Sequence, residues 1–342
     1  MPSHLDWLES LSPWPEEFGL GRMRTLLREL GEPQGAFPAI HVVGTNGKST
    51  ATRRAAAFLQ REGLTTGAYT SPHVSGWSER IQVEGQDADI EAALARVRDP
   101  AERLGATQFE VLTAAALAEF AERQVDVAVV EAGLGGRLDA TNVLDSRIVV
   151  LTNVGLDHTD VLGATREQIA AEKLAVASLD ATLIVGEPEW GGHYADDVAR
   201  AAAEAFLGRE VDGGVEISLP GRFDVVGDDV FAGAHNPAGI EWLLERLPRS
   251  DYVIVASILA DKDADAMLRL LARAGRELIA TQSRSARALP ADELAQAAEP
   301  FFESVEVEPD PVRALDRAES PVLVTGSLYL ISDLSVRLQR IP

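Results

Sequence analysis

The sequence contains no cysteine, no long apolar run and very little lysine. Without cysteine, disulfide bridges, thiolate nucleophiles and thiolate metal sites are excluded. No stretch approaches the roughly 20 apolar residues of a membrane-spanning helix. The N-terminus lacks the apolar run behind a basic patch that marks a secretory signal. We therefore expect a cytoplasmic protein that does not enter a membrane.

Positive charge is also scarce. The 54 acidic residues outnumber the 31 basic ones and give a net charge of −23, which repels nucleic acid. Only three of the basic residues are lysines, Lys48, Lys173 and Lys262. Lysine offers a compact ammonium and an amine that can lose its proton, and arginine offers neither. The three lysines are therefore candidates for special chemistry, with chance survival as the alternative.

The length of 342 residues suggests about two domains. In the first part, short β-branched runs alternate with helical patterns, which is typical of a doubly wound parallel sheet. A Gly- and acid-rich region at 208–220 marks the boundary, so we expect α/β domains at 1–212 and 219–342. The second should contain about six short strands. The expected strands of the first lie at 39–44, 65–70, 126–133, 147–154 and 181–187, and its expected helices at 48–63, 109–124 and 165–179.

The segment after the run AIHVVG has the pattern of a phosphate-binding loop. It reads G-x-x-G-K-S, a shortened variant in which Val42 stands where the longer motif has a glycine. Glycines let backbone N–H groups turn toward phosphate, Lys48 reaches the β- and γ-phosphates, and Ser49 is placed to bind Mg²⁺. We expect a nucleoside triphosphate on Gly44, Thr45, Asn46, Gly47, Lys48, Ser49 and Thr50.

Two further residues lie at the C-terminal ends of expected strands, the edge where α/β sheets bind ligands. Glu131 closes the run DVAVVEAG, and His158 follows RIVVLTNV. A carboxylate with Ser49 suits a Mg²⁺ that keeps waters and phosphate oxygens. Imidazole is an unusual ligand for magnesium, so a hydrogen-bonded loop histidine is the alternative for His158.

Beyond VVGTNGKST, ordered motifs cover most of the chain. They are YTSPHVSGWSERIQVEG (69–85), TQFEVLTAAAL (107–117), VVEAGLGGRLDATNV (129–143), LTNVGLDHTDVLG (151–163), AAEKLAV (170–176), LPGRFDVV (219–226), AHNP (234–237), ILADKDADAM (258–267) and VTGSLYLISD (324–333). In these motifs the chain resembles the Mur-ligase-like folylpolyglutamate and dihydrofolate synthases. The resemblance implies a P-loop central domain with a parallel sheet and a smaller Rossmann-like α/β C-terminal domain.

The same resemblance implies an ATP-dependent ligase. Such enzymes phosphorylate a pteroate or folate carboxylate with ATP, and the glutamate amine then displaces phosphate. ATP and Mg²⁺ are the implied cofactors, and K⁺ is left open as a further cation. The implied partners are small molecules alone, bound by a monomer, with neither nucleic acid nor membrane.

The resemblance also implies roles for individual residues. The implied catalytic residues are Lys173 as a carbamate, Arg222 and His235. Arg222 and Asn236 also reach the nucleotide, and the metal ligands are Ser49, Ser71, Glu131 and His158. The implied substrate-binding residues are Pro72, His73, Arg80, Thr107, Gln108, Phe109, Leu138, Asp139 and Ala140, with Leu138 to Ala140 on a flexible loop.

Several of these residues have plainer alternatives. A lysine on an apolar helix is usually a surface residue whose stem packs on its neighbours, which is the alternative for Lys173, expected in mid-helix. Asn236 before Pro237 explains itself as a helix N-cap. Ser71 also reads as a turn residue, and Phe109 as core. The context of Lys262 leaves substrate contact and a solvated charge run equally open.

Two family features on the adenosine side are absent. Only about thirty residues separate GEPEW from LPGRF, and they lack the segment whose Asn contacts the adenine side. Ala232 stands where the family has an acidic residue. The phosphate, metal and lysine positions are intact, so we expect weaker or altered base recognition, or a partner segment that supplies it, rather than decay. The competing functions are a P-loop NTPase that drives motion, a non-catalytic folate- or nucleotide-binding relative, and a Mur ligase acting on cell-wall nucleotides.

Overall fold

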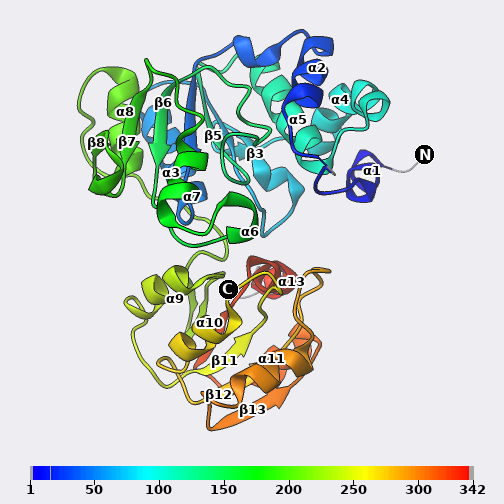
Figure 1. The fold of residues 1–342 in the computed structure, drawn as a ribbon, viewed down its shortest axis with the longest axis vertical. Coiled ribbons are helices and arrows are strands. Elements are labelled where there is room, and N and C mark those ends of the chain that lie inside the picture. The colour runs from blue at the N-terminus through cyan, green and yellow to red at the C-terminus, as the bar shows by residue number, and fades with distance from the viewer. Residues whose placement is uncertain (1–2, 16, 339–342) are drawn as a thin grey trace. The chain divides into compact units, whose positions relative to one another are not determined.

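The computed structural model describes residues 3–15 and 17–338 and divides into two compact units (Figure 1). The first unit comprises residues 1–71 and 77–217, and the second comprises 72–76 and 218–342. Each unit holds one sheet with helices packed on it. The short segment 72–76 belongs to the second unit although its neighbours in sequence belong to the first.

The first unit is built on an eight-stranded sheet in the order β4-β3-β2-β5-β1-β6-β7-β8. Its strands are β1 (Ala39–Val43), β2 (Thr66–Tyr69), β3 (Ile81–Val83), β4 (Gln86–Asp87), β5 (Val127–Glu131), β6 (Ser146–Leu151), β7 (Thr182–Val185) and β8 (His193–Tyr194). Its helices are α1 (His4–Ser10), α2 (Gly21–Glu29), α3 (Lys48–Arg61), α4 (Ile90–Leu104), α5 (Gln108–Glu122), α6 (Thr159–Leu162), α7 (Arg166–Leu174) and α8 (Val198–Leu207). Short 3₁₀ turns lie at η1 (Pro33–Gly35), η2 (Trp77–Arg80) and η3 (Pro188–Trp190).

All five strands and all three helices expected in this part of the chain are present. The sheet is not wholly parallel, however, because β3 runs antiparallel to both β2 and β4. The reason is local: Glu84 and Gly85 both have positive φ, of 52° and 72°, and form the tight turn of a hairpin.

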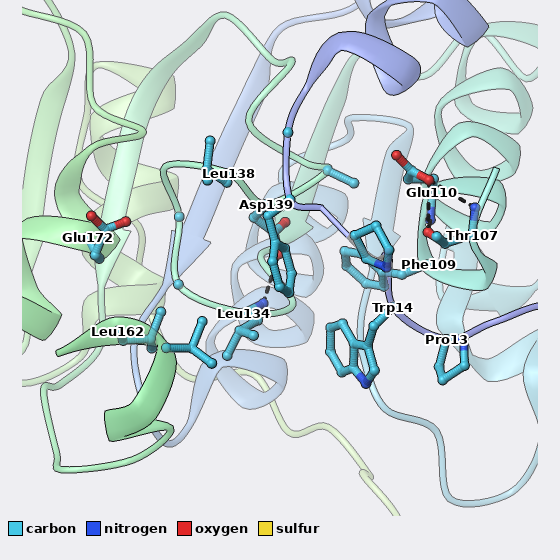
Figure 2. A pocket seen from close by; sticks show the side chains of 17 residues that line it. Pro13, Trp14, Thr107, Phe109, Glu110, Leu134, Leu138, Asp139, Leu162 and Glu172 are labelled. Atoms are coloured by element: carbon cyan, nitrogen blue, oxygen red, sulfur yellow. Dashed lines mark hydrogen bonds between the residues drawn. The ribbon is translucent and has the colours of Figure 1, made fainter. Parts of the chain in front are cut away.

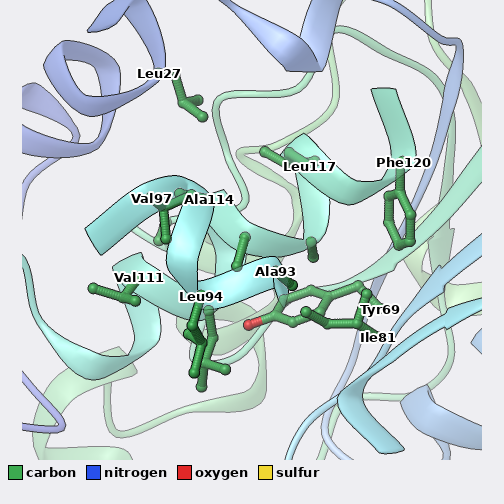
Figure 3. Close-up of a cluster of buried hydrophobic side chains, with 14 of the residues drawn as sticks. Leu27, Tyr69, Ile81, Ala93, Leu94, Val97, Val111, Ala114, Leu117 and Phe120 are labelled. Atoms are coloured by element: carbon green, nitrogen blue, oxygen red, sulfur yellow. The ribbon is translucent and has the colours of Figure 1, made fainter. Parts of the chain in front are cut away.

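Helices cover both faces of this sheet. Strands alternate their side chains, so Ile40 and Val42 of β1 enter one core with α3 and α8. The other face packs against α4 and α5, where Tyr69, Leu94 and Phe120 are fully buried (Figure 3). The central strand β1, buried along its whole length, leads directly into the phosphate loop.

The second unit has a six-stranded sheet, as expected, in the order β13-β12-β11-β14-β10-β9. Its strands are β9 (Asp224–Val226), β10 (Asp229–Phe231), β11 (Val253–Ala256), β12 (Glu277–Ala280), β13 (Ser304–Val307) and β14 (Val322–Thr325). Its helices are α9 (Pro237–Leu244), α10 (Ala264–Leu271), α11 (Ala291–Ala298), α12 (Pro311–Arg317) and α13 (Leu328–Leu338). Here too one edge is a hairpin, since β9 pairs antiparallel with β10.

Candidate active site

The phosphate loop lies between β1 and α3, where its sequence placed it. Gly44 has φ of 150°, and a Cβ at this position would collide with Oγ1 of Thr152. Gly47 has φ of 77° and precedes the first residue of α3, which is Lys48. Both glycines are therefore required by the backbone path.

The segment that follows β6 pins this loop. The Thr45 N–H donates to the Asn153 carbonyl oxygen at 3.0 Å, and the Asn46 N–H donates to Asn153 Oδ1 at 3.0 Å. Thr152 Oγ1 donates to the Asn46 carbonyl oxygen at 2.7 Å. Thr152 and Asn153 had no role assigned from sequence, although LTNVG was recognised as a motif. Their function is to hold a loop more than a hundred residues earlier in the chain.

The side chains of the loop's last residues fit an anion site. Lys48 lies at the N-terminal end of α3, and its Nζ donates to the Thr45 carbonyl oxygen at 3.3 Å. Ser49 is buried in the same first turn, and Thr50 is half-buried. A helix N-terminus and one ammonium group together favour a bound phosphate.

The residues expected at a metal lie at the carboxyl ends of neighbouring strands. Glu131 ends β5 and is almost completely buried, and the N–H of Ser71, beyond β2, donates to its Oε2 at 3.0 Å. His158 follows β6, has φ of 51° and caps the N-terminus of α6. Its Nε2 lies 3.8 Å from Asp157 Oδ1.

This donor set fits Mg²⁺ that also takes phosphate and water oxygens. Among residues 3–15 and 17–338, no group of three or more His, Cys, Asp and Glu side chains is arranged to hold a metal by itself. A single buried carboxylate with hydroxyl groups nearby is what a magnesium site completed by a nucleotide needs.

Lys173 is buried, which rules out the surface alternative. It lies at the C-terminal end of α7, so the mid-helix position expected from sequence was wrong; the helix stops at Leu174. Its Nζ donates to the Gly44 carbonyl oxygen at 2.8 Å. Burial, with a smaller contribution from the charge of Lys48, lowers the pKa of Lys173 to about 7, although Asp157 and Asp139 oppose this. A sizeable fraction of the amine is therefore neutral near pH 7.

A cavity of about 230 Å³ opens in the first unit (Figure 2). Five residues expected to bind substrate line it, namely Thr107, Phe109, Leu138, Asp139 and Ala140. The ring of Phe109 packs so closely on Gly133 that a Cβ there would lie 2.5 Å from it. The lining is mostly apolar, as in pockets that take flat organic molecules.

The cavity also contains residues that sequence reasoning missed. The segment between α1 and α2 brings Pro13, Trp14, Pro15 and Phe18 to its wall. The large apolar side chains of Trp14, Phe18 and Leu138 are exposed there. The run SPWPEEFG contained a signal for a binding surface, because its aromatic residues stand among prolines rather than in a core pattern. The segments that complete the cavity lie some 100 residues further along the chain, so the sequence did not connect them.

Four other residues expected at the substrate do not line this cavity. Gln108 donates from Nε2 to the Leu8 carbonyl oxygen at 3.1 Å and so anchors the N-terminal segment. Arg80 stacks on Trp77, with its guanidinium 4.7 Å from the ring centroid. Pro72 and His73 belong to the second unit.

The loop 133–141, which contains the stretch Leu138–Ala140 expected to be flexible, is held by hydrogen bonds to a buried side chain. Asp139 accepts the Leu134 N–H at 2.8 Å and the Thr141 N–H at 3.0 Å. Burial raises the pKa of Asp139, against the hydrogen bonds that lower it. On its outer side, the Arg137 N–H donates to the Glu172 carbonyl oxygen at 3.0 Å. The loop is therefore a shaped wall rather than an open flap.

The remaining expected site residues lie in the second unit. Asn236 is the N-cap of α9, accepts the Gly239 N–H at 2.8 Å and precedes Pro237, which confirms the capping interpretation. His235 is half-buried, with Nδ1 3.0 Å from the Gly233 carbonyl oxygen. Arg222 is half-buried in the turn before β9.

Ala232 and the side chain of Lys262, in the same unit, are both largely shielded from solvent. Ala232, which stands where the resemblance led us to expect an acidic residue, is buried in the core. The Lys262 side chain is only 5% exposed, with Nζ 3.4 Å from Asp261 Oδ2, so it is not a solvated charge run.

Within the described residues, no helix is long and apolar enough to cross a membrane. Two family models match the chain: the Mur ligase middle domain over residues 42–187, and the glutamate ligase domain of Mur ligases over 221–332. The Escherichia coli dihydrofolate synthase/folylpolyglutamate synthase is 31% identical, covering 97% of this chain and 94% of that protein. The chain belongs to the dihydrofolate synthase/folylpolyglutamate synthase family of Mur ligases.

Solved structures of this family agree along the whole chain. E. coli FolC in complex with DHPP and ADP has a TM-score of 0.89 and 29% identity, covering 99% of this chain and 98% of that one. The Yersinia pestis enzyme complexed with AMPPNP and Mn ion has a TM-score of 0.84 and 28% identity, covering 99% and 100%. The alignment with the E. coli synthase spans 397 positions against 342 residues here. This member of the family therefore lacks internal segments that the relative has.

Proposed function

We propose that this synthase joins L-glutamate to the carboxylate of dihydropteroate, of a (tetrahydro)folate or of both, with ATP as the energy source. The observation that carries the proposal is that one unit combines a phosphate loop, a buried carboxylate at the sheet edge and an apolar cavity. A chain with this combination aligns over nearly its whole length with enzymes of this name.

ATP is held by its phosphates on residues 44–50, with the Lys48 ammonium and the α3 N-terminus offsetting their charge. The residues that would hold Mg²⁺ are Ser49, Ser71, Glu131 and His158. When bound, the cation neutralises phosphate oxygens, and K⁺ is a further candidate cation. From the second unit, Arg222, His235 and Asn236 are proposed to reach the nucleotide and the transferred phosphoryl group.

The reaction has two steps. A carboxylate oxygen of the pteroyl substrate attacks the γ-phosphorus, the bond to the β–γ bridging oxygen breaks, and ADP leaves. The glutamate amine then attacks the acyl carbon, loses a proton and expels phosphate, which leaves an amide. A positive charge close to the transferred phosphoryl group lowers the barrier of the first step.

Lys173 is proposed to react with CO₂. The buried ammonium first loses one proton; the neutral amine then forms an N–C bond with CO₂ and releases a second proton, which leaves a carbamate with one negative charge. The lowered pKa supplies the neutral amine. Arginine could not take this role, which accounts for a lysine in a chain that otherwise uses arginine.

The cavity is the proposed site of the pteridine ring system. Trp14, Phe18 and Phe109 offer aromatic surface, and Thr107 and Asp139 offer polar atoms at the same wall. Four further residues are proposed to bind the substrate: Gln108, which anchors the segment containing Trp14, and Pro72, His73 and Arg80. We also propose a cytoplasmic monomer whose partners are small molecules, not nucleic acid or membranes.

The deciding experiment is a phosphate-release assay with each pteridine in turn, with and without glutamate. Release that requires both substrates, with the amide product identified by mass spectrometry, is the expected result. Glutamate-independent ATP turnover would instead favour an NTPase. Tight folate binding without phosphate release would identify a non-catalytic relative. This is the second candidate function, because the chain lacks the expected adenine-side segment and has Ala232 in place of an acidic residue.

A further inference from the structure

A buried histidine lies on the strand that feeds the phosphate loop. His41 is in the middle of β1 and has no exposed surface. Its neighbours Ile40 and Val42 point into the core beneath α3. By alternation, the imidazole points to the opposite face of the sheet, together with Ala39 and Val43. An aliphatic side chain would fill such a position without the cost of burying a polar ring, so packing alone does not explain the histidine.

The imidazole has one hydrogen-bond partner, the hydroxyl of Thr141, with His41 Nε2 2.8 Å from Thr141 Oγ1. The same hydroxyl donates to Asp139 Oδ1. With Asp139 ionised, Thr141 Oγ1 gives its single proton to the carboxylate, so His41 Nε2 carries the proton of the other bond. Nδ1 has no partner among the described residues. Burial lowers the pKa of His41 to about 4, so the ring is neutral at pH 7.

This chain of bonds ends on the wall of the substrate cavity. Asp139 spans the loop by holding the N–H groups of Leu134 and Thr141. The same stretch of the loop contributes Leu134, Leu138 and Ala140 to the lining of the cavity. Leu134 and Leu138 are labelled there in Figure 2. The loop joins β5 to β6, which flank β1 on either side. It must therefore cross β1, and His41 is the polar group of β1 that contacts it.

We propose that His41 is a positioning residue: through the Thr141 hydroxyl it fixes Asp139 and so holds the loop 133–141 in the shape that walls the pteroyl cavity. The kinetic part of this inference rests on the proposed function. His41 itself lines no part of the cavity, so it acts on the substrate only through the loop.

The strand context makes the inference testable. His41 lies three residues before Gly44, so general damage to β1 would disturb the phosphate loop and raise the KM for ATP. Loss of the hydrogen bond to Thr141 should instead raise the KM for the pteroyl substrate alone. The ratio of the two KM changes therefore separates positioning of the loop from collapse of the strand.

Five variants carry the kinetic experiment. His41→Val and Thr141→Val each remove one side of the bond, and each should raise the pteroyl KM about tenfold, the effect of losing roughly 1.4 kcal/mol. The KM for ATP should stay within about twofold of wild type. His41→Gln keeps a donor with similar reach, and Thr141→Ser keeps the hydroxyl. Both variants should therefore have a pteroyl KM close to that of wild type. Ser146→Ala is the control, because it deletes a buried hydroxyl without a described partner at the end of the same connection.

A double variant and a spectrum complete the test. In the Thr141→Val background, His41→Val should add less than about twofold to the pteroyl KM, since its partner is already gone. Nitrogen NMR of the wild-type protein at pH 7, assigned by comparison with His41→Gln, should show one of the six histidines as the neutral tautomer protonated at Nε2. Melting temperatures identify variants that fail to fold.

The outcomes separate this inference from the proposed function. Equal rises in both KM values, additive effects in the double variant, or a His41 protonated at Nδ1 would each overturn the positioning role. If wild-type enzyme shows no glutamate-dependent turnover with any pteridine, the proposed function fails. The NMR spectrum still decides the hydrogen-bond chain in that case, and tritiated-folate binding replaces KM as the readout for the loop.

Discussion

The phosphate loop and the substrate cavity lie in the same unit but are built differently. The loop is a single run, residues 44–50, whose shape follows from two glycines and a helix N-terminus. The cavity is assembled from four segments, near residues 13–19, 107–110, 134–140 and 161–172. The loop takes its path from its own glycines and is then held by Thr152, Asn153 and Lys173, whereas the cavity exists only through packing of distant segments.

This difference separates the two binding functions. The loop presents backbone groups and one ammonium to phosphate, so its variants should change ATP kinetics. The cavity presents apolar surface, so its variants should change pteroyl affinity and little else. Lys173 connects the two, because its Nζ holds the Gly44 carbonyl oxygen while its helix carries the Glu172 carbonyl that holds Arg137.

The largest effect is expected at the loop. Lys48→Met removes the ammonium that we propose lies beside the transferred phosphoryl group, and it should lower kcat/KM for ATP about 10³-fold. Equilibrium binding of the pteroyl substrate should be unchanged, because the cavity is built from other residues than the phosphate loop. Lys48→Arg is the matched control for charge. Loss of pteroyl binding in Lys48→Met would show that the two sites are not separable.

The next largest effect concerns stability. The folded pKa of Lys173 is about 7 against 10.5 ordinarily, so between these values the unfolded chain holds a proton that the folded chain lacks. Stability therefore rises with pH across that window. Lys173→Met removes this dependence and, in CO₂-free buffer, should be more stable than wild type by roughly 4 kcal/mol at pH 7. The gain should vanish above pH 10.5.

Denaturant unfolding at several pH values measures this difference. Equal stability of Lys173→Met and wild type at pH 7 would contradict this prediction, because the hydrogen bond to the Gly44 carbonyl oxygen would then offset the cost of burying the amine.

Carbamylation is tested at the same residue. Lys173→Arg keeps a cation but cannot form a carbamate, so kcat should fall about 10²-fold. Wild-type enzyme depleted of CO₂ should lose activity and regain it with bicarbonate, and isotope-labelled bicarbonate should give a carbamate signal by NMR. Full activity of Lys173→Arg would refute the carbamate.

At the cavity, Trp14→Ala should raise the pteroyl KM about tenfold and leave the KM for ATP unchanged, because it removes aromatic surface from the wall. Trp242→Ala is a matched control, since Trp242 is 46% exposed, Trp14 is 39% exposed, and Trp242 lies in the second unit. A changed KM for ATP in Trp14→Ala would break the separation of the two sites.

The smallest effect is expected at the second unit. Asn236→Ala removes the N-cap of α9 and should destabilise that unit by about 1 kcal/mol, whatever its catalytic role. Asn236→Asp keeps the cap and should restore stability. If Asn236→Asp is stable but loses ATP turnover, the amide has a function beyond capping.

Local patterns along the chain were enough to predict the alternation of strands and helices, the phosphate loop, and the places of Glu131 and His158 at the C-terminal ends of their strands. These follow from local patterns: glycines that demand a backbone path, apolar runs of strand length, and residues directly beyond them. The hairpins at the sheet edges were missed because their strands are only two or three residues long.

The contacts between residues that are distant in sequence became visible only in the folded structure. Trp14 and Phe109 line one cavity although they lie far apart in sequence, and Gln108 ties the N-terminal segment to α5. Lys173 is buried because α7 ends against the phosphate loop. His41 meets Thr141 because a connection from β5 to β6 has to cross the strand between them. Contacts of this kind depend on strand order, which periodicity along the chain does not encode.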